Sequence, residues 1–318
     1  MHTHAHSGHS HGISGTTQQM DRAMGVGVAL NVIFVIVELG FGFAADSLAL
    51  ISDAGHNAGD VLGLLLAWGA LALARRPPSG RYTWGLGRST IFAAFANASL
   101  LIVACGVIVW EATHRLAEPP PVQGMTMIVV AAIGVGINTL TAIWLAAGRK
   151  GDANIRGAFL HMAADAAVSA GVVVAGIVIG LTGWNLVDPI VSVVISLVIA
   201  WGTWDLLRES VELAMDAVPR GVDLEQVRRD LAAVEGVTRV HDLHIWSAST
   251  SHQTATAHLT IGNEASFADV LHAATEVLQH SHGVSHTTIQ IEHEPAAEAC
   301  SPPHSGEPRP LTDGNDHP

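Results

Sequence analysis

The sequence predicts an α-helical membrane protein with six transmembrane helices, followed by a small α+β domain. Of its 318 residues, 49% are apolar and 14% are charged, with a mean hydropathy of +0.38, which is too apolar for an ordinary soluble domain. Six runs of about twenty apolar residues follow one another from residue 24. After residue 208 the apolar runs give way to helical and alternating patterns, which predict the second domain.

The apolar runs are separated by connectors rich in proline, glycine and charged residues. With a cytoplasmic N-terminus, nine basic residues lie on the cytoplasmic side and only Arg115 lies outside. The positive-inside rule therefore places both termini in the cytoplasm. The nine are Arg22, Arg75, Arg76, Arg81, Arg88, Arg149, Lys150, Arg156 and Arg208. The predicted spans are 24–44, 49–74, 90–112, 124–147, 158–181 and 186–207.

The second domain is predicted to have the element order α-β-β-α-β. "VDLEQVRRDLAAVEGV" (222–237) and "SFADVLHAATEVLQH" (266–280) have helical spacing, whereas 238–248, 252–262 and 284–294 read as strands. This order predicts a two-layer unit with one modest core. Such a small unit gains from dimerisation because alone it buries little surface.

The termini differ in composition from both domains. The predicted organisation is a histidine-rich N-terminal tail (1–20), a transmembrane domain (21–208), the α+β domain (209–295) and a polar, proline-rich, disordered tail (296–318). The first tail has neither the basic nor the apolar region of a signal peptide. Its histidines either capture metal weakly or are incidental. They are His2, His4, His6, His9 and His11.

Charge and cysteine content exclude two classes of partner and site. Acidic residues outnumber basic ones by 28 to 15, so the chain lacks the basic surface that nucleic-acid binding requires. Cys105 and Cys300 lie far apart and outside any C-x-x-C motif, so we expect neither a disulfide framework nor a cysteine zinc site. The chain is rich in alanine, glycine and arginine and contains little lysine. This composition indicates a bacterial protein and hence an inner-membrane location.

Two apolar spans each carry a histidine and an aspartate spaced four residues apart. They are His56 with Asp60 in "ISDAGHNAGDVLG" and His161 with Asp165 in "FLHMAADAAVSAG". Residues i and i+4 are neighbours on a helix, so each pair can hold one ion. Two such pairs facing each other would supply two imidazoles and two carboxylates, a set suited to tetrahedral Zn²⁺.

Ionisable side chains inside a membrane need a reason, since each costs at least about 2.5–3.5 kcal/mol on insertion scales. A divalent cation would offset this cost for the four residues, whereas the alternative is hydrogen bonding between helices without an ion. The matched double motif favours the ion. Nearby, Asp53 and Asn57 are hypothesised to orient His56 or its counterpart on the other helix, or to have only helix-end or packing roles. Glu38 either lines a water-filled route to the ion or pairs with a neighbouring residue.

Several motifs together resemble the cation diffusion facilitator family, in particular its zinc-transporting branch. They are "SLALISDAGHNAGD" (47–60), "HMAAD" (161–165), "GW" followed by "VDP" (183–189) and "VHDLHIW" (240–246), and the resemblance covers about residues 20–295. It implies a homodimer with a ferredoxin-like cytoplasmic domain that binds metal, and export of metal in exchange for protons. It also implies that His56, Asp60, His161 and Asp165 are the transport ligands.

The resemblance also implies a metal site in the cytoplasmic domain. His241 and His258 on adjacent strands, with Glu292 on the third, match positions that the family uses for this purpose. Nearby alternatives are His286, which we include in the predicted set, and His244, His293 and Glu294. Strand alternation predicts that His241 and His244 lie on opposite faces and do not share an ion.

The predicted function is a Zn²⁺/H⁺ antiporter that exports zinc, with possible tolerance of cobalt or cadmium, by alternating access. Zinc is then the transported substrate and a regulator of the cytoplasmic domain, and no organic cofactor is expected. The main alternative is a zinc-binding membrane sensor that does not transport. A channel is disfavoured by tight four-ligand coordination. A membrane metalloprotease would need an H-E-x-x-H helix, which is missing from the sequence, so no enzymatic activity is predicted.

Overall fold

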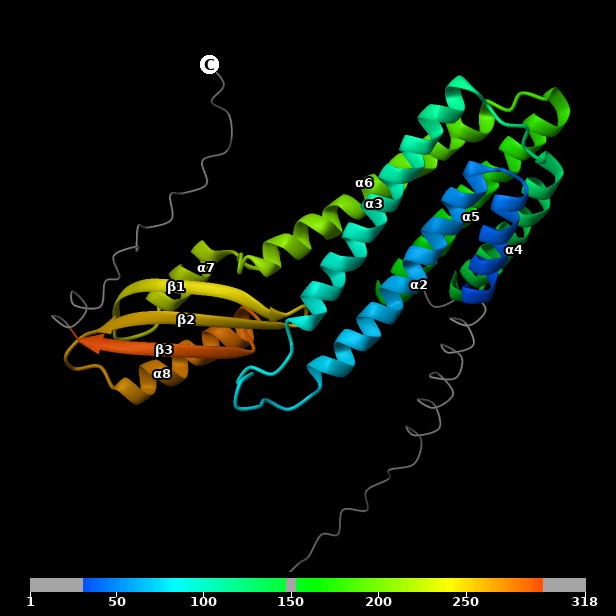
Figure 1. Ribbon diagram of the computed structural model, residues 1–318. Helices are drawn as coiled ribbons and strands as arrows, with labels where there is room; N and C mark the ends of the chain where they lie inside the picture. The colour runs from blue at the N-terminus through cyan, green and yellow to red at the C-terminus, as the bar shows by residue number, and fades with distance from the viewer. Residues whose placement is uncertain (1–30, 147–152, 294–318) are drawn as a thin grey trace, which may run out of the picture. The chain divides into compact units, whose positions relative to one another are not determined.

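The computed structural model of the chain describes residues 31–146 and 153–293 (Figure 1). The predictions for the N-terminal histidines, Cys300 and the C-terminal tail lie outside the described residues. Two compact units are present. Within the described residues, the first comprises 31–68 and 96–207, and the second comprises 69–95 and 208–293.

Five long apolar helices confirm five of the predicted spans. Each has the length and composition to cross a membrane. The first predicted span appears as a shorter apolar helix, Asn31–Ala44, whose predicted start lies outside the described residues. The five are α2 (Leu48–Ala74), α3 (Ser89–Ala117), α4 (Gly124–Ala146), α5 (Ala153–Thr182) and α6 (Val187–Ala214). α3 and α6 continue past their predicted ends, because the prediction followed the apolar runs and both helices continue into polar sequence.

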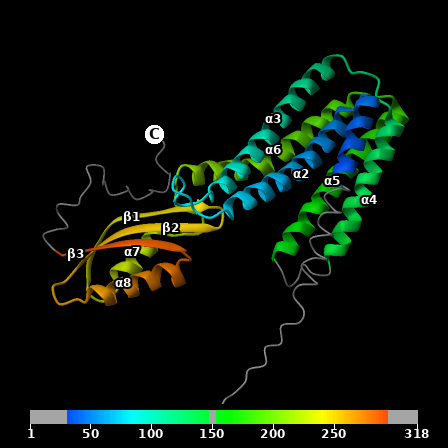
Figure 2. The same cartoon turned by 60° about the horizontal axis from the view of Figure 1, so that its bottom comes forward.

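Helices α4 and α5 pack side by side, as Figures 1 and 2 show. A Cβ added at Gly124 would lie 2.8 Å from the backbone oxygen of Gly176, and one added at Gly176 would lie 3.1 Å from the oxygen of Gly124. Small residues permit such close approach between helices in membranes. These glycines therefore set the spacing between α4 and α5.

The start of α2 is fixed by Asp188, a fully buried residue near the start of α6. Its Oδ2 accepts a hydrogen bond from the Leu48 backbone N–H at 2.7 Å, and its Oδ1 accepts from the Ala49 N–H at 3.2 Å. The Ser47 hydroxyl also donates to Oδ1, at 2.6 Å. The first backbone N–H groups of a helix need such acceptors, so Asp188 orients the helix that carries His56.

The α+β domain has the predicted order α-β-β-α-β. Its elements are α7 (Leu224–Ala232), β1 (Val237–Ser249), β2 (His252–Ile261), α8 (Phe267–Glu276), the π-helical turn η1 (Val277–Ser281) and β3 (His286–His293). The sheet order is β1-β2-β3, with β1 antiparallel and β3 parallel to β2. The predicted fold class is thereby confirmed.

One face of this sheet packs against α7 and α8, and Figure 2 shows both helices on that side. Alternate residues of β2, from Ala255 to Ile261, are buried there with Leu231 and Val270 from the helices. His258 and its alternate neighbours therefore lie on the other face of the sheet, which we call the outer face.

A β-bulge at Asp242 changes the facing of β1 residues. Asp242 has a φ of 50°, and the β1–β2 register shifts between His241 and His244. His241 pairs with His258 and His244 pairs with Thr256, so both histidines lie on the outer face. The prediction that alternation separates them is wrong, because the bulge inserts one residue and reverses the alternation. An aspartate tolerates this left-handed conformation better than most residues do.

Candidate metal centres

The two H-x-x-x-D pairs come together between α2 and α5. His56 and Asp60 lie one turn apart on α2, and His161 and Asp165 lie one turn apart on α5. His56 Nε2 is 3.0 Å from Asp165 Oδ1 and 3.8 Å from Asp60 Oδ2. His161 Nε2 is 3.3 Å from Asp60 Oδ2 and 3.6 Å from Asp165 Oδ2. We call these four residues the membrane cluster.

The spacing of the membrane cluster suits one small cation. Tetrahedral zinc with bonds of about 2.0–2.2 Å places its ligand atoms about 3.3–3.6 Å apart. The four nitrogen–oxygen distances, from 3.0 to 3.8 Å, bracket this range. Ligand atoms of His56, Asp60 and Asp165 all lie within 4.8 Å of one another, whereas His161 is not part of this tighter group. Each imidazole contacts a carboxylate of the opposite helix, so the geometry depends on α2 and α5 together.

Access differs among the four side chains. Asp165 is 4% exposed and His56 is 15% exposed, whereas Asp60 and His161 are 34% and 46% exposed. The open side of the cluster is therefore the side of Asp60 and His161. An ion can therefore be held by two buried ligands and completed by two accessible ones.

The hypothesis that Asp53 and Asn57 orient His56 is wrong. Asn57 donates a hydrogen bond to Glu38 at 3.0 Å, and Asp53 accepts one from Ser169 at 2.7 Å. His56 Nδ1 is buried and has no hydrogen-bond partner among the described residues. Asp53, Asn57 and Glu38 therefore form a separate polar cluster behind the ligands.

A second cluster lies on the outer face of the α+β sheet. His241 Nε2 is 3.2 Å from Glu292 Oε2, and His258 Nδ1 is 3.0 Å from Glu292 Oε1. The two imidazole rings meet edge to face, with their centroids 5.2 Å apart. Their positions follow from the register, since His241 pairs directly with His258 and Glu292 lies beside Thr260. We call these three residues the sheet cluster.

The sheet cluster fits a metal ion because one buried polar atom of each residue lacks a hydrogen-bond partner. His241 Nε2, His258 Nδ1 and Glu292 Oε2 are buried without a hydrogen-bond partner in the described structure. Buried polar atoms are seldom left unpartnered, so these three atoms call for a partner. One ligand atom from each residue lies within 4.8 Å of the others.

Other predicted residues of this domain lie elsewhere or have other partners. His286 begins β3, six residues or about 20 Å along the strand from Glu292, and its ring contacts Trp84 at 4.8 Å. The structure therefore does not bring His286 to the sheet cluster. His244 contacts Asp242 at 3.0 Å, and Asp242 also lies 3.5 Å from His258. Asp242 was missed because only the bulge brings it there. Glu294 lies outside the described residues.

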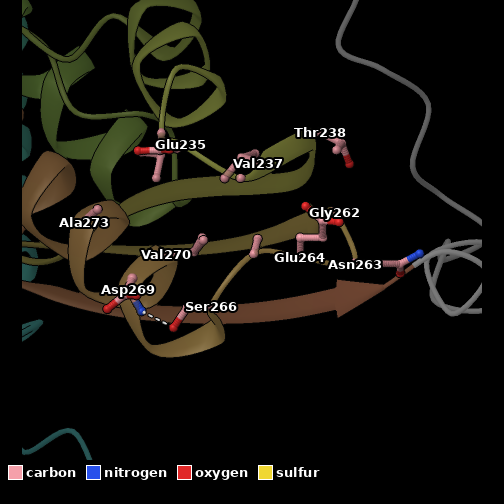
Figure 3. Close-up of a pocket in the computed structure, with 13 residues that line it drawn as sticks. Glu235, Val237, Thr238, Gly262, Asn263, Glu264, Ser266, Asp269, Val270 and Ala273 are labelled. Atoms are coloured by element: carbon pink, nitrogen blue, oxygen red, sulfur yellow. Dashed lines mark hydrogen bonds between the residues drawn. The ribbon is translucent and has the colours of Figure 1, made fainter.

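A hollow of about 890 Å³ lies beside the start of α8, as Figure 3 shows. Ser266 caps this helix by accepting a hydrogen bond from the Asp269 N–H at 3.4 Å. Glu235, Glu264 and Asp269 line the hollow. The ligand atoms of these three acids do not come close enough together to hold a metal. Among the described residues, such close groups occur only in the membrane and sheet clusters. This hollow is therefore not a candidate metal centre.

Comparison with protein families gives two matches that together cover most of the chain. Residues 24–213 match a family model described as the cation efflux transmembrane domain. Residues 219–294 match a model described as the cytoplasmic domain of cation efflux proteins, whose name refers to a dimer. The membrane cluster lies within the first match and the sheet cluster within the second.

Similar proteins include two bacterial efflux proteins. The metal cation efflux system protein CzcD of Cupriavidus metallidurans is 36% identical over 94% of this chain and 94% of its own length. The cadmium, cobalt and zinc/H⁺-K⁺ antiporter of Bacillus subtilis is 32% identical over 82% of this chain and 85% of its own length. The solved metal-bound C-terminal domain of CzcD is 32% identical and covers 22% of this chain and 99% of that domain, with a TM-score of 0.22.

Proposed function

Because the chain belongs to the cation diffusion facilitator family of cation efflux proteins, we propose that it exports Zn²⁺ from the cytoplasm in exchange for protons. It is an integral membrane protein whose function is metal cation efflux, and the sensor alternative is not supported. The observation that carries the choice of ion is the membrane cluster, in which two imidazoles and two carboxylates converge.

Zinc is the proposed substrate because this ligand set combines nitrogen and oxygen donors, which suits tetrahedral zinc. An all-oxygen set would better suit manganese. Cobalt and cadmium are the expected competitors, and the Bacillus subtilis relative is named for all three metals. His56, Asp60, His161 and Asp165 are the proposed ligands.

The proposed mechanism is alternating access around the membrane cluster. The helices rock so that the four ligands face first the cytoplasm and then the opposite side of the membrane. Histidine and aspartate must be deprotonated to bind metal, so protons compete with zinc for the same atoms. Imidazole is suited to this exchange because its unperturbed pKa of about 6.5 lies near physiological pH. The name of the Bacillus subtilis relative, which includes H⁺, supports this coupling.

The sheet cluster is proposed as a regulatory zinc site, with His241, His258 and Glu292 as ligands. The buried, unpartnered atoms of these residues support it. We further propose a homodimer, which the name of the second family match supports. The bacterial relatives support an inner-membrane location, and the distribution of basic residues supports cytoplasmic termini.

The test is zinc uptake by proteoliposomes with an acidic interior, comparing the wild type with Asp60→Ala and Asp165→Ala. Gradient-driven uptake by the wild type and its loss in both variants are the expected results. Zinc-binding titration and size-exclusion profiles check that the variants are folded, and Asp205→Ala, a replacement on α6 outside the membrane cluster, is a control. Equal uptake in all four proteins, or zinc binding without uptake by the wild type, would refute the proposal.

A further inference from the structure

A polar cluster that the metal ligands do not include lies beside them in the first unit. Glu38 on the helix Asn31–Ala44 and Asp53 on α2 are both fully buried. Asn57 donates a hydrogen bond to Glu38 Oε2 at 3.0 Å, and Ser169 donates one to Asp53 Oδ2 at 2.7 Å. Each carboxyl group thus has one oxygen held by a neutral donor.

The remaining oxygens of the two carboxyl groups have no donor. Glu38 Oε1 and Asp53 Oδ1 are buried and unpartnered among the described residues, although the two side chains are in hydrogen-bonding contact. Ionised carboxylates only accept hydrogen bonds, so this contact becomes a hydrogen bond only when one group carries a proton. Two negative charges sharing a buried site are strongly disfavoured.

The described surroundings supply no permanent positive charge to the pair. Among the described residues, neither carboxyl group forms an ion pair with an arginine or lysine. The ionisable groups that face Asp53 are His56 on its own helix and Asp165 on α5. Helix α4 approaches the site at Gly134, where an added Cβ would lie 3.3 Å from Ser169 Oγ, and its sequence contains no ionisable residue. A proton is therefore the cation that fits between the two carboxyl groups.

We propose that Glu38 and Asp53 form a carboxyl pair that binds one proton, separate from the metal ligands, and exchanges it during transport. The inference rests on the proposed zinc/proton exchange. Binding forms one O–H bond with a proton from the side to which zinc is exported, and release breaks it on the cytoplasmic side. This pair adds one proton to those that compete at the membrane cluster.

The donors of the pair connect it to the metal ligands. Asn57 follows His56 on α2, and Ser169 lies one turn after Asp165 on α5. A shift of α2 against α5 that changes the membrane cluster must also move the two groups that hold Glu38 and Asp53. The protonation of the pair is in this way linked to the conformation of the metal site.

The test measures how many protons accompany each zinc ion. Full-length protein in proteoliposomes accumulates zinc under a series of pH gradients with the membrane potential held at zero. The accumulation ratio at equilibrium then changes about tenfold per exchanged proton for each unit of the gradient. Glu38→Gln keeps the size and hydrogen bonds of the side chain but cannot bind the proton. Ser52→Ala is the matched control, because it removes a buried hydroxyl beside Asp53 that contacts Ser196 on α6 at 3.3 Å.

The expected result is a loss of one proton per zinc in Glu38→Gln, which lowers accumulation about tenfold at a gradient of one pH unit, while Ser52→Ala matches the wild type. An unchanged slope in a Glu38→Gln protein that still binds zinc would overturn the carboxyl pair. Absence of gradient-driven uptake in the wild type would instead overturn the proposed function.

A second measurement addresses the pair directly and does not depend on transport. The infrared difference spectrum of the wild type between acidic and alkaline buffer should show a protonated carboxyl band that is missing in Glu38→Gln. If Glu38→Gln fails to bind zinc, Asp53→Asn is measured in its place. A wild-type spectrum without the band, or the same band in the variant, would overturn the inference.

Discussion

Replacement of Asp188 by alanine should destabilise the transmembrane domain at the start of α2. The carboxylate accepts hydrogen bonds from the Ser47 hydroxyl and the backbone N–H groups of Leu48 and Ala49. Alanine removes all three acceptor contacts at once. Because Asp188 is fully buried, the freed donors have no ready access to water.

The size of the effect follows from the three lost contacts. A buried donor left without an acceptor costs about 1–3 kcal/mol, and removal of the buried charge returns part of its desolvation cost. We therefore expect the free energy of unfolding to fall by about 3–5 kcal/mol. Asp188→Asn keeps one carbonyl acceptor and should lose about 1–2 kcal/mol. Zinc affinity should fall in the same order, since α2 carries His56 and Asp60.

The assay is denaturant unfolding of the full chain in detergent micelles, combined with zinc titration. Ser192→Ala is the control, because its hydroxyl is equally buried and, among the described residues, donates to the Asp188 backbone oxygen alone, at 2.7 Å. That variant should lose about 1 kcal/mol or less. If Asp188→Ala unfolds at the same denaturant concentration as Ser192→Ala, the carboxylate does not anchor α2 and the reasoning fails.

Three further predictions concern other parts of the chain. Gly124→Ala should destabilise the α4–α5 pair by about 1–3 kcal/mol, since its Cβ would meet a backbone oxygen at 2.8 Å. Gly136→Ala has open space around it and should be neutral or slightly stabilising. Equal unfolding midpoints of the two variants would contradict this prediction. His241→Ala should remove one bound zinc per protomer, measured by equilibrium dialysis of the full chain, while the exposed His272→Ala on α8 should not; unchanged stoichiometry in both would rule out the sheet cluster. Asp242→Ala should lower the free energy of unfolding of the α+β domain by about 1–2 kcal/mol, because alanine disfavours a φ of 50°. Asp242→Gly should retain more of the stability. A glycine variant less stable than the alanine variant would show that the backbone conformation at the bulge is not the cause of the loss.

The helices and the paired motifs could be predicted because both depend on local spacing. An apolar run of about twenty residues is sufficient to indicate a span, and an interval of four places His56 and Asp60 on one side of a helix. The pairing between helices could not be derived in the same way. In the structure His56 lies closer to Asp165 on α5 than to Asp60 on its own helix, at 3.0 Å against 3.8 Å.

Features that depend on contacts between distant segments were predicted less well. Asp53 and Asn57 were assigned to His56 because they are near it in sequence, but their partners, Ser169 and Glu38, lie on other helices. The facing of His241 was derived from strict alternation, which the bulge at Asp242 interrupts. A bulge is defined by the register between two strands, so one strand's sequence alone does not reveal it.

The two candidate centres differ in a way that suits two different tasks. Half of the membrane cluster is accessible, with Asp60 and His161 at 34% and 46% exposure, whereas His241, His258 and Glu292 are between 4% and 18% exposed. Exposed ligands are more easily displaced than buried ones, because the release of metal requires that protons or water take its place. We therefore expect the membrane cluster to exchange its ion in each cycle and the sheet cluster to retain its ion over many cycles. Rapid isotope exchange at the sheet cluster, measured in Asp165→Ala to silence the first site, would contradict this division.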